Sequence, residues 1–355
     1  MLKKNWWKWL GAVLLLYGIF IGTSTKVGPG IAQISPTKVT GNQEFNLNIE
    51  GYNTHFNSGN TQVWLKVQGK PICPSSIKII DQNHLSVSFD TIALNLSGNM
   101  LASSVFIENE TDGLFLANDI LQLQFPENPR FADSVVACGN APQHLSQQYF
   151  SFPYRIVLFE TIRNLNFHVP MWFAMMVLAL VSFIFSIKHL KTGNAKDDIW
   201  ANGFAKTALL FGLMGVSTGM FWANFTWGEP WPNDPKLKGA AVGVLLYVAY
   251  QVLRSSIDDD DKTGRISAVY NVFAFPMFIV LIQLLPKFMA DDSLHPNAGG
   301  NSGFSDYDLD NNLRKVFYPI SLGWVLVAAW IGQLTARVDW LKHKKEFQLD
   351  KYVNE

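Results

Sequence analysis

The residues best suited to chemistry form a tryptophan-rich segment in the second half of the chain. It contains Trp227-Gly-x-x-Trp231-x-x-Asp234, and Trp222 lies shortly before it. Indole rings present flat apolar faces, and Gly228 would let a ligand approach the backbone closely. The pattern favours a planar hydrophobic ligand. A belt of tryptophans at the depth of lipid headgroups is an equally good interpretation.

Two histidines, His168 and His295, lie before and after this segment in the sequence. Taken singly, each is more simply explained as a hydrogen-bonded surface or loop residue. As a pair, two neutral imidazoles on opposite faces of a porphyrin would satisfy its iron axially, so haem fits them. This interpretation requires both histidines to lie on the same side of whatever elements position them.

Those elements are predicted to be membrane spans, because 48% hydrophobic residues, 26 Phe, 12 Trp and only 16% charged residues are unusual for a soluble protein. A bilayer core of about 30 Å requires roughly 20 apolar residues in a helix. Six segments qualify: Trp6–Gly22, Val169–Ile187, Phe204–Trp222, Gly239–Leu253, Ser267–Phe288 and Val316–Thr335. The first is either a retained anchor or a signal peptide, and the lack of a convincing cleavage site favours the anchor.

Lysine and arginine clusters orient the six spans. They precede span one and follow spans two, four and six: Lys3, Lys4 and Lys8; Lys188, Lys191 and Lys196; Arg254, Lys262 and Arg265; Arg337, Lys342, Lys344 and Lys345. Six spans place all four clusters on one side, which the positive-inside rule makes cytoplasmic. Both termini are then cytoplasmic, and His168, His295 and the tryptophan-rich segment lie outside. The other histidines are cytoplasmic or belong to the long interval before span two.

That interval, residues 24–150, alternates apolar and polar residues in short runs separated by Gly, Pro and Asn. The alternation predicts a small antiparallel β-sandwich on the outer side. The segment GYNTHFNSG weakly resembles immunoglobulin-like or IPT-type domains in fold, without implying their function. A disulfide between Cys73 and Cys138 is possible in an oxidising compartment, and two unpaired thiols are about as plausible.

The expected fold is therefore a polytopic α-helical membrane protein with six transmembrane helices and an inserted all-β, sandwich-like extracytoplasmic domain. Its expected parts are an anchor helix (1–23), the β-rich domain (24–150), a five-helix membrane domain (151–341) with the tryptophan-rich loop at 222–238, and a cytoplasmic tail (342–355). A formal net charge of 0 indicates no nucleic-acid partner. Motifs of the types GxxxxGK[ST] and HExxH are absent from the sequence.

From about Arg163 to Leu341 the chain resembles CcmC, a family of haem-handling membrane proteins in cytochrome c maturation. The resemblance depends on motifs in order: His168-Val-Pro, Thr218-Gly, Trp227-Gly-x-x-Trp231-x-x-Asp234, an Asp-rich turn ending in Gly264-Arg265, and Leu294-His295. It implies a bacterial inner-membrane protein in which the tryptophan-rich (WWD) loop supports transiently bound haem b. The resemblance assigns the iron to His168 and His295, and haem contacts to Trp222, Trp227, Gly228, Trp231 and Asp234.

The resemblance also implies partners and a role. The family presents haem to a periplasmic chaperone (CcmE-like) and works with ABC transporter subunits (CcmA/CcmB-like) and a haem lyase (CcmF-like). The protein would then be a scaffold and donor, with no catalytic residues of its own. Pro230 and Asn233 stand where the family loop commonly has tryptophans, and the β-rich domain has no counterpart in the family pattern. Two alternatives remain: a CcsA-type haem lyase, and a haem-free membrane-anchored β-domain binding protein.

Overall fold

The computed structural model describes residues 2–41, 43–67, 70–90, 100–125, 150–155, 158–295 and 309–353. The chain forms two compact units, one of residues Thr25–Glu160 and the other of Met1–Ser24 together with Thr161–Glu355. The β unit is thus inserted between the first helix and the rest of the helical unit. It extends to Glu160 rather than to residue 150, because Phe152 pairs with Val27 and returns the chain to the start of the unit.

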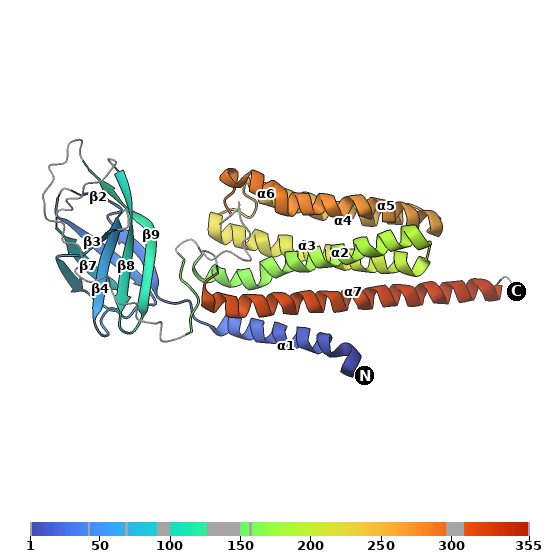
Figure 1. Ribbon diagram of the computed structural model, residues 1–355, viewed down its shortest axis with the longest axis horizontal. Helices are drawn as coiled ribbons and strands as arrows, with labels where there is room; N and C mark the ends of the chain where they lie inside the picture. The colour runs from blue at the N-terminus through green and yellow to red at the C-terminus, as the bar shows by residue number, and fades with distance from the viewer. Residues whose placement is uncertain are drawn as a thin grey trace. The chain divides into compact units, whose positions relative to one another are not determined.

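The β unit contains two sheets around one core (Figure 1). One sheet has the order β1-β3-β7-β6, with β1 at Gly30–Ser35, β3 at Phe45–Tyr52, β7 at His84–Phe89 and β6 at Ser76–Ile79. The other has the order β2-β9-β8-β4-β5, with β2 at Lys38–Thr40, β9 at Gly113–Gln124, β8 at Met100–Asn109, β4 at Thr61–Val67 and β5 at Lys70–Ile72.

Burial in these strands follows the alternation of the sequence. In β3, for example, Leu47 and Ile49 are buried while their neighbours Asn46 and Asn48 are exposed. Side chains from both sheets, such as Leu85 and Leu121, join the same buried cluster. The predicted two-sheet arrangement is therefore present, but it is not wholly antiparallel, because β2 pairs with β9 in parallel. The predicted Cys73–Cys138 disulfide stays a prediction, because Cys138 lies outside the described residues.

The helical unit is a bundle whose long helices run side by side (Figure 1). A 3-10 turn at Phe159–Asn164 (η1) leads into α2, and a π-helical segment at Val280–Leu284 (η2) follows α5. A second 3-10 turn, η3, covers Ala290–Asp292. The helices are α1 (Leu2–Ser24), α2 (Leu165–Thr192), α3 (Ala195–Trp227), α4 (Pro235–Ser255), α5 (Asp260–Ile279), α6 (Leu285–Phe288) and α7 (Asn311–Val353).

Among the described residues, six helical segments are long and apolar enough to cross a membrane. Each contains one of the spans expected from the sequence, so that prediction is confirmed for the helices. Helix α1 packs along α7, and α2, α3, α4, α5 and α7 contribute to one apolar core. At the end of the bundle where α2 ends and α3 begins, Arg254 makes a two-pronged ion pair with Asp198, at 2.7 and 2.8 Å.

The third span is longer than its hydropathy suggests. Helix α3 continues to Trp227, so Trp222 lies inside it, and only residues 228–234 separate α3 from α4. The expected loop at 222–238 is shorter for two reasons. Residues 223–227 contain no Gly or Pro to end the helix, and Pro235 occupies the first helical position of α4.

Candidate functional site

His168 lies in the first turn of α2 and faces α3. Its Nδ1 is 3.0 Å from the carbonyl oxygen of Gly215 and 3.2 Å from Oγ1 of Thr218. The ring also passes very close to Gly219, where an added Cβ would lie 2.7 Å from Cε1 of the imidazole. A glycine at 219 is therefore required for this position of the ring. Since a carbonyl oxygen can only accept, Nδ1 of His168 carries the proton.

His295 comes from the segment after α6 and is held by Asp234. Its Nδ1 is 3.1 Å from Oδ1 of Asp234, and the two side chains are only 10% and 0% exposed. The carboxylate can only accept this hydrogen bond, so Nδ1 of His295 is also protonated. Both predicted iron ligands thus use Nδ1 as a donor within the protein, which leaves the lone pair on Nε2.

Asp234 ties the start of α4 to the residues just before His295. Its carboxylate caps α4 by accepting from the backbone N–H groups of Lys236 and Leu237, at 2.8 and 3.2 Å. It also accepts from Oγ of Ser293 and from the backbone N–H of Leu294, both at 2.7 Å. Burial alone would raise the pKa of Asp234, but the hydrogen bonds from His295, Ser293 and Leu294 outweigh it and hold the pKa below its ordinary value. The side chain is therefore an anion that ties the start of α4 to His295.

Two tryptophans connect the histidines. The ring of Trp222 lies 5.8 Å from that of His168 and 6.3 Å from that of Trp227, and Trp227 makes an edge contact of 5.0 Å with His295. Nε1 of Trp222 donates to Oγ1 of Thr161 at 3.3 Å, which fixes its orientation. We call these four rings, His168, Trp222, Trp227 and His295, the aromatic path. It brings together residues from α2, α3 and the segment after α6.

The remaining predicted site residues have different surroundings. Trp231 lies outside the aromatic path and is 41% exposed. Gly228 ends α3 in the left-handed conformation, with φ of 83°, and its N–H donates to the carbonyl of Asn224. An added Cβ at Gly228 would meet no atom within 4 Å. Its backbone conformation, rather than lack of space, therefore explains this glycine.

The donor set fits a haem iron better than a bare metal ion. The described residues contain no group of three or more His, Cys, Asp or Glu side chains that could hold an ion. A porphyrin supplies four nitrogens of its own and needs only axial ligands from the protein. A ligating histidine usually donates its other ring N–H to a carbonyl or a carboxylate, and His168 and His295 each have one such partner. The residues present therefore fit haem.

A family model described as "Cytochrome C assembly protein" matches residues 89–292, more than half of the 355-residue chain. The chain belongs to the cytochrome c assembly protein family. The matched range includes His168 and Asp234 and ends just before His295. It also begins inside the β unit, at the end of β7.

Curated relatives within this family carry two names. Heme exporter protein C of Rhodobacter capsulatus is 27% identical over 137 residues, which cover 36% of this chain and 54% of the relative. The protein of the same name from Paracoccus denitrificans is 25% identical over 118 residues, covering 32% and 49%. Cytochrome c biogenesis protein CcsA of Prochlorococcus marinus is 37% identical over 82 residues, covering 23% and 25%. The chain thus spans about half the length of the heme exporter relatives, and less of the CcsA relative.

Some residues of the site could not be found from the histidine and tryptophan patterns alone. Trp172, one turn after His168, packs at 6.4 Å from its ring. Gly215 was also missed, and it lies on the same face of α3 as Thr218, Gly219 and Trp222, which the sequence had already singled out; together they surround the imidazole. Their spacing of three and four residues is a signal that the sequence does carry. Nothing in the sequence pointed to Thr161 or Ser293.

Trp227 is expected to contribute more to haem retention than the exposed Trp231. Replacing Trp227 with Ala removes the ring that contacts both Trp222 and His295. Since an aromatic pair contributes about 0.5–1.5 kcal/mol, haem affinity should fall about two- to tenfold, and Trp227→Phe should restore part of it. The measurement is a haem titration followed at the Soret band. Trp340→Ala, which removes a ring stacked on His343, is the control, and an equal loss in that variant would contradict the prediction.

Haem retention should also be insensitive to mild acid. Burial lowers the pKa of His295 below its ordinary value of 6.5, and the positive charge of Lys236 acts in the same direction against the Asp234 hydrogen bond. The folded protein therefore keeps this imidazole neutral at a pH where an unfolded chain would bind a proton. Retention should stay level as the pH falls through 6.5 and decline only at more acid pH. The free energy of unfolding should begin to fall near pH 6.5, where the unfolded chain's imidazole takes up its proton. Half-loss at pH 6.5 or above in a Soret titration would contradict this.

Proposed function

We propose that this protein binds haem between His168 and His295 and passes it on during the biogenesis of c-type cytochromes. The observation that carries the proposal is the pair of histidines whose Nδ1 atoms are engaged by Gly215 and Asp234, joined through Trp222 and Trp227. Membership of the cytochrome c assembly family supports it, as do relatives named as heme exporters.

The proposed setting is the outer face of a bacterial inner membrane. The six apolar helices and the lysine and arginine clusters support this placement, with both termini cytoplasmic and the β unit outside. Cysteines introduced singly near each end of the bundle, for example at Ser256 and Glu229, would test it. Glu229→Cys should react with a membrane-impermeant maleimide in intact spheroplasts, and Ser256→Cys should react only after lysis. The reverse pattern would overturn the orientation.

The chemistry proposed for the chain's own residues is binding and orientation. Haem iron would accept the Nε2 lone pairs of His168 and His295, while Asp234 and Gly215 hold each imidazole in the required tautomer. Trp222 and Trp227 would cover the porphyrin with apolar surface. No covalent step on the haem is assigned to these residues. The haem is cargo, the b-type molecule before covalent attachment, and a periplasmic haem chaperone of the CcmE type is the proposed acceptor.

A CcsA-type haem lyase is the second candidate, because CcsA proteins are also among the relatives. The two functions differ in the product. The purified protein, loaded with haem in nanodiscs, is mixed with either an apo haem chaperone or an apocytochrome that carries a CxxCH motif. A donor should lose its Soret absorption to the chaperone and leave the apocytochrome without thioether-linked haem on a denaturing gel. Covalent haem on the apocytochrome would overturn the donor role, and a colourless preparation from haem-replete cells would overturn both.

A further inference from the structure

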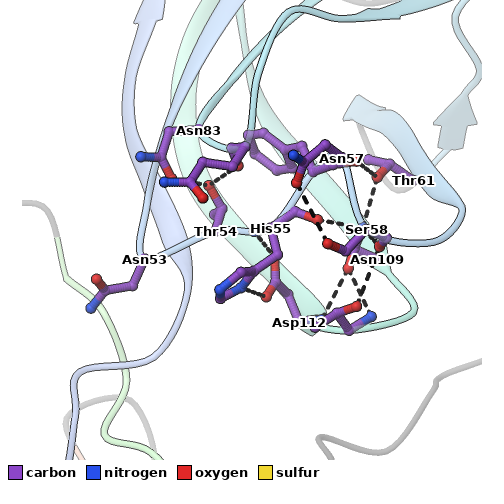
Figure 2. A network of polar contacts seen from close by, with 12 residues as sticks. Asn53, Thr54, His55, Asn57, Ser58, Thr61, Asn83, Asn109 and Asp112 are labelled. Carbon is purple, nitrogen blue, oxygen red and sulfur yellow. Dashed lines mark hydrogen bonds and ion pairs between the residues drawn. The ribbon is translucent and has the colours of Figure 1, made fainter.

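A third histidine, His55, is held in the same manner as the histidines of the bundle but belongs to the β unit. It lies in the segment between β3 and β4, and its ring points to the turn between β8 and β9, as Figure 2 shows. Nδ1 of His55 is 2.8 Å from Oδ1 of Asp112. The backbone N–H of His55 donates to Oδ2 of the same carboxylate at 2.6 Å. Both oxygens of Asp112 are thus engaged by one residue.

Burial differs sharply between the two partners. The side chain of Asp112 is 0% exposed, whereas that of His55 is 50% exposed. The carboxylate can only accept a hydrogen bond, so Nδ1 of His55 carries the proton and the lone pair of the ring lies on Nε2. This atom makes no hydrogen bond with any residue that the structure describes. A buried acceptor therefore orients an accessible imidazole nitrogen.

The turn that carries Asp112 is itself rigid. Oδ1 of Asn109 accepts from the backbone N–H groups of Thr111 and Asp112, at 2.8 and 3.1 Å. Its Nδ2 donates to Oγ1 of Thr61 at 2.8 Å and to the carbonyl of Ser58 at 3.0 Å (Figure 2). These bonds cross-link the His55 segment to the β8–β9 turn. The position of the imidazole is consequently fixed before any ligand arrives.

The arrangement repeats the contacts made by His295 in the helical unit. We call the site of His168 and His295 the bundle site. Asp234 is buried, accepts Nδ1–H of His295 and accepts a neighbouring backbone N–H, and Asp112 does the same for His55. His84, the other histidine among the described residues of the β unit, differs in the burial of its partner. It pairs with Asp81 at 3.0 Å, but that carboxylate is 53% exposed, while the two imidazoles are similarly exposed at 50% and 49%. His84 is thus a matched comparison without a buried partner.

We propose that His55 ligates haem at a second site of this protein, with Asp112 as its positioning residue. A bare divalent ion needs three or four protein ligands, and no group of three donors surrounds His55 among the described residues. A haem iron needs only one imidazole from this surface, because the porphyrin fills the equatorial positions. The proposal is based on the haem-handling function above, which would bring haem to the side of the membrane proposed for the β unit.

The first test uses the unmodified full-length protein in nanodiscs. Diethyl pyrocarbonate modifies accessible imidazoles, and mass spectrometry reports each histidine separately. Added haemin should protect His55 at least about fivefold while leaving His84 as reactive as before. Equal reactivity of His55 with and without haemin would overturn the proposal. Because the readout is local, protection of His55 can be observed even if the bundle site binds no haem, so the two proposals fail separately.

The second test uses variants in a background that lacks the bundle ligands, His168→Ala with His295→Ala. This background should still bind haemin and give a Soret band, with an affinity in the micromolar range for a single exposed imidazole. His55→Ala should weaken that binding at least about tenfold, Asp112→Asn should weaken it less, and His84→Ala should leave it unchanged. Thermal unfolding of each variant shows whether the β unit is intact. An identical loss in the His84 variant, or none in the His55 variant, would overturn the proposal.

Discussion

Replacing His168 or His295 with Ala is expected to lower haem affinity about a hundredfold or more, and the double replacement should leave the bundle site unable to retain haem through purification. Each imidazole would supply one axial nitrogen, so each single replacement removes one of the two ligands that the protein would give the iron. The measurement is haem per protein from the pyridine haemochrome spectrum after purification. Added imidazole should restore part of the Soret band in each single variant, because it replaces the missing nitrogen.

His189 provides a matched control for this experiment. It lies on the same helix, at the other end of α2, and its Nδ1 is also 3.0 Å from a backbone carbonyl, that of Asn194. His189→Ala removes an equivalent imidazole and an equivalent hydrogen bond without touching the aromatic path. It should purify with as much haem as the parent protein. If both single variants of the site keep the parent spectrum, the ligand assignment is wrong.

Replacing Asp234 with Asn is expected to have the second largest effect. The carboxylate accepts five hydrogen bonds, and an amide would turn one of its two acceptor oxygens into a donor facing other donors. His295 would lose its fixed tautomer, and loss of such a partner typically costs about 10- to 100-fold in metal affinity. The expected result is a loss of haem affinity of that size, measured by haemin titration, with His168 still able to ligate.

The same replacement should also destabilise the helical unit, since the amide group would face other donors and a buried unsatisfied group costs about 1–3 kcal/mol. Asp310→Ala separates the two effects. Asp310 accepts from the backbone N–H of Leu313 at 2.7 Å at the start of α7, and its replacement leaves every hydrogen bond of Asp234 in place. It should lower the thermal midpoint without changing haem affinity. Equal haem loss in both variants would mean that Asp234 acts only through stability.

The sequence by itself determined the elements of this protein and the identity of its candidate site. Apolar segments of about 20 residues have the length needed to span a bilayer as helices, and alternating segments form strands with one buried face, because both patterns are local. For that reason the six helices and the two-layer β unit could be predicted. His168, Trp227, Asp234 and His295 were also identifiable, because their motifs resemble those of a known family and the other histidines lie elsewhere in the predicted topology. Hydropathy placed the ends of helices less well, as the extension of α3 to Trp227 shows.

The tertiary structure alone decided what each of these residues does. Asp234 was expected to contact haem, yet its carboxylate is fully engaged by the cap of α4 and by the His295 segment, some 60 residues later. The partner of His168, the carbonyl of Gly215, carries no side-chain signal. The pairing of His55 with Asp112 joins positions 57 residues apart. Hydrogen bonds depend on atoms brought together by packing, and sequence periodicity determines only which face of an element is buried, not which atom it meets.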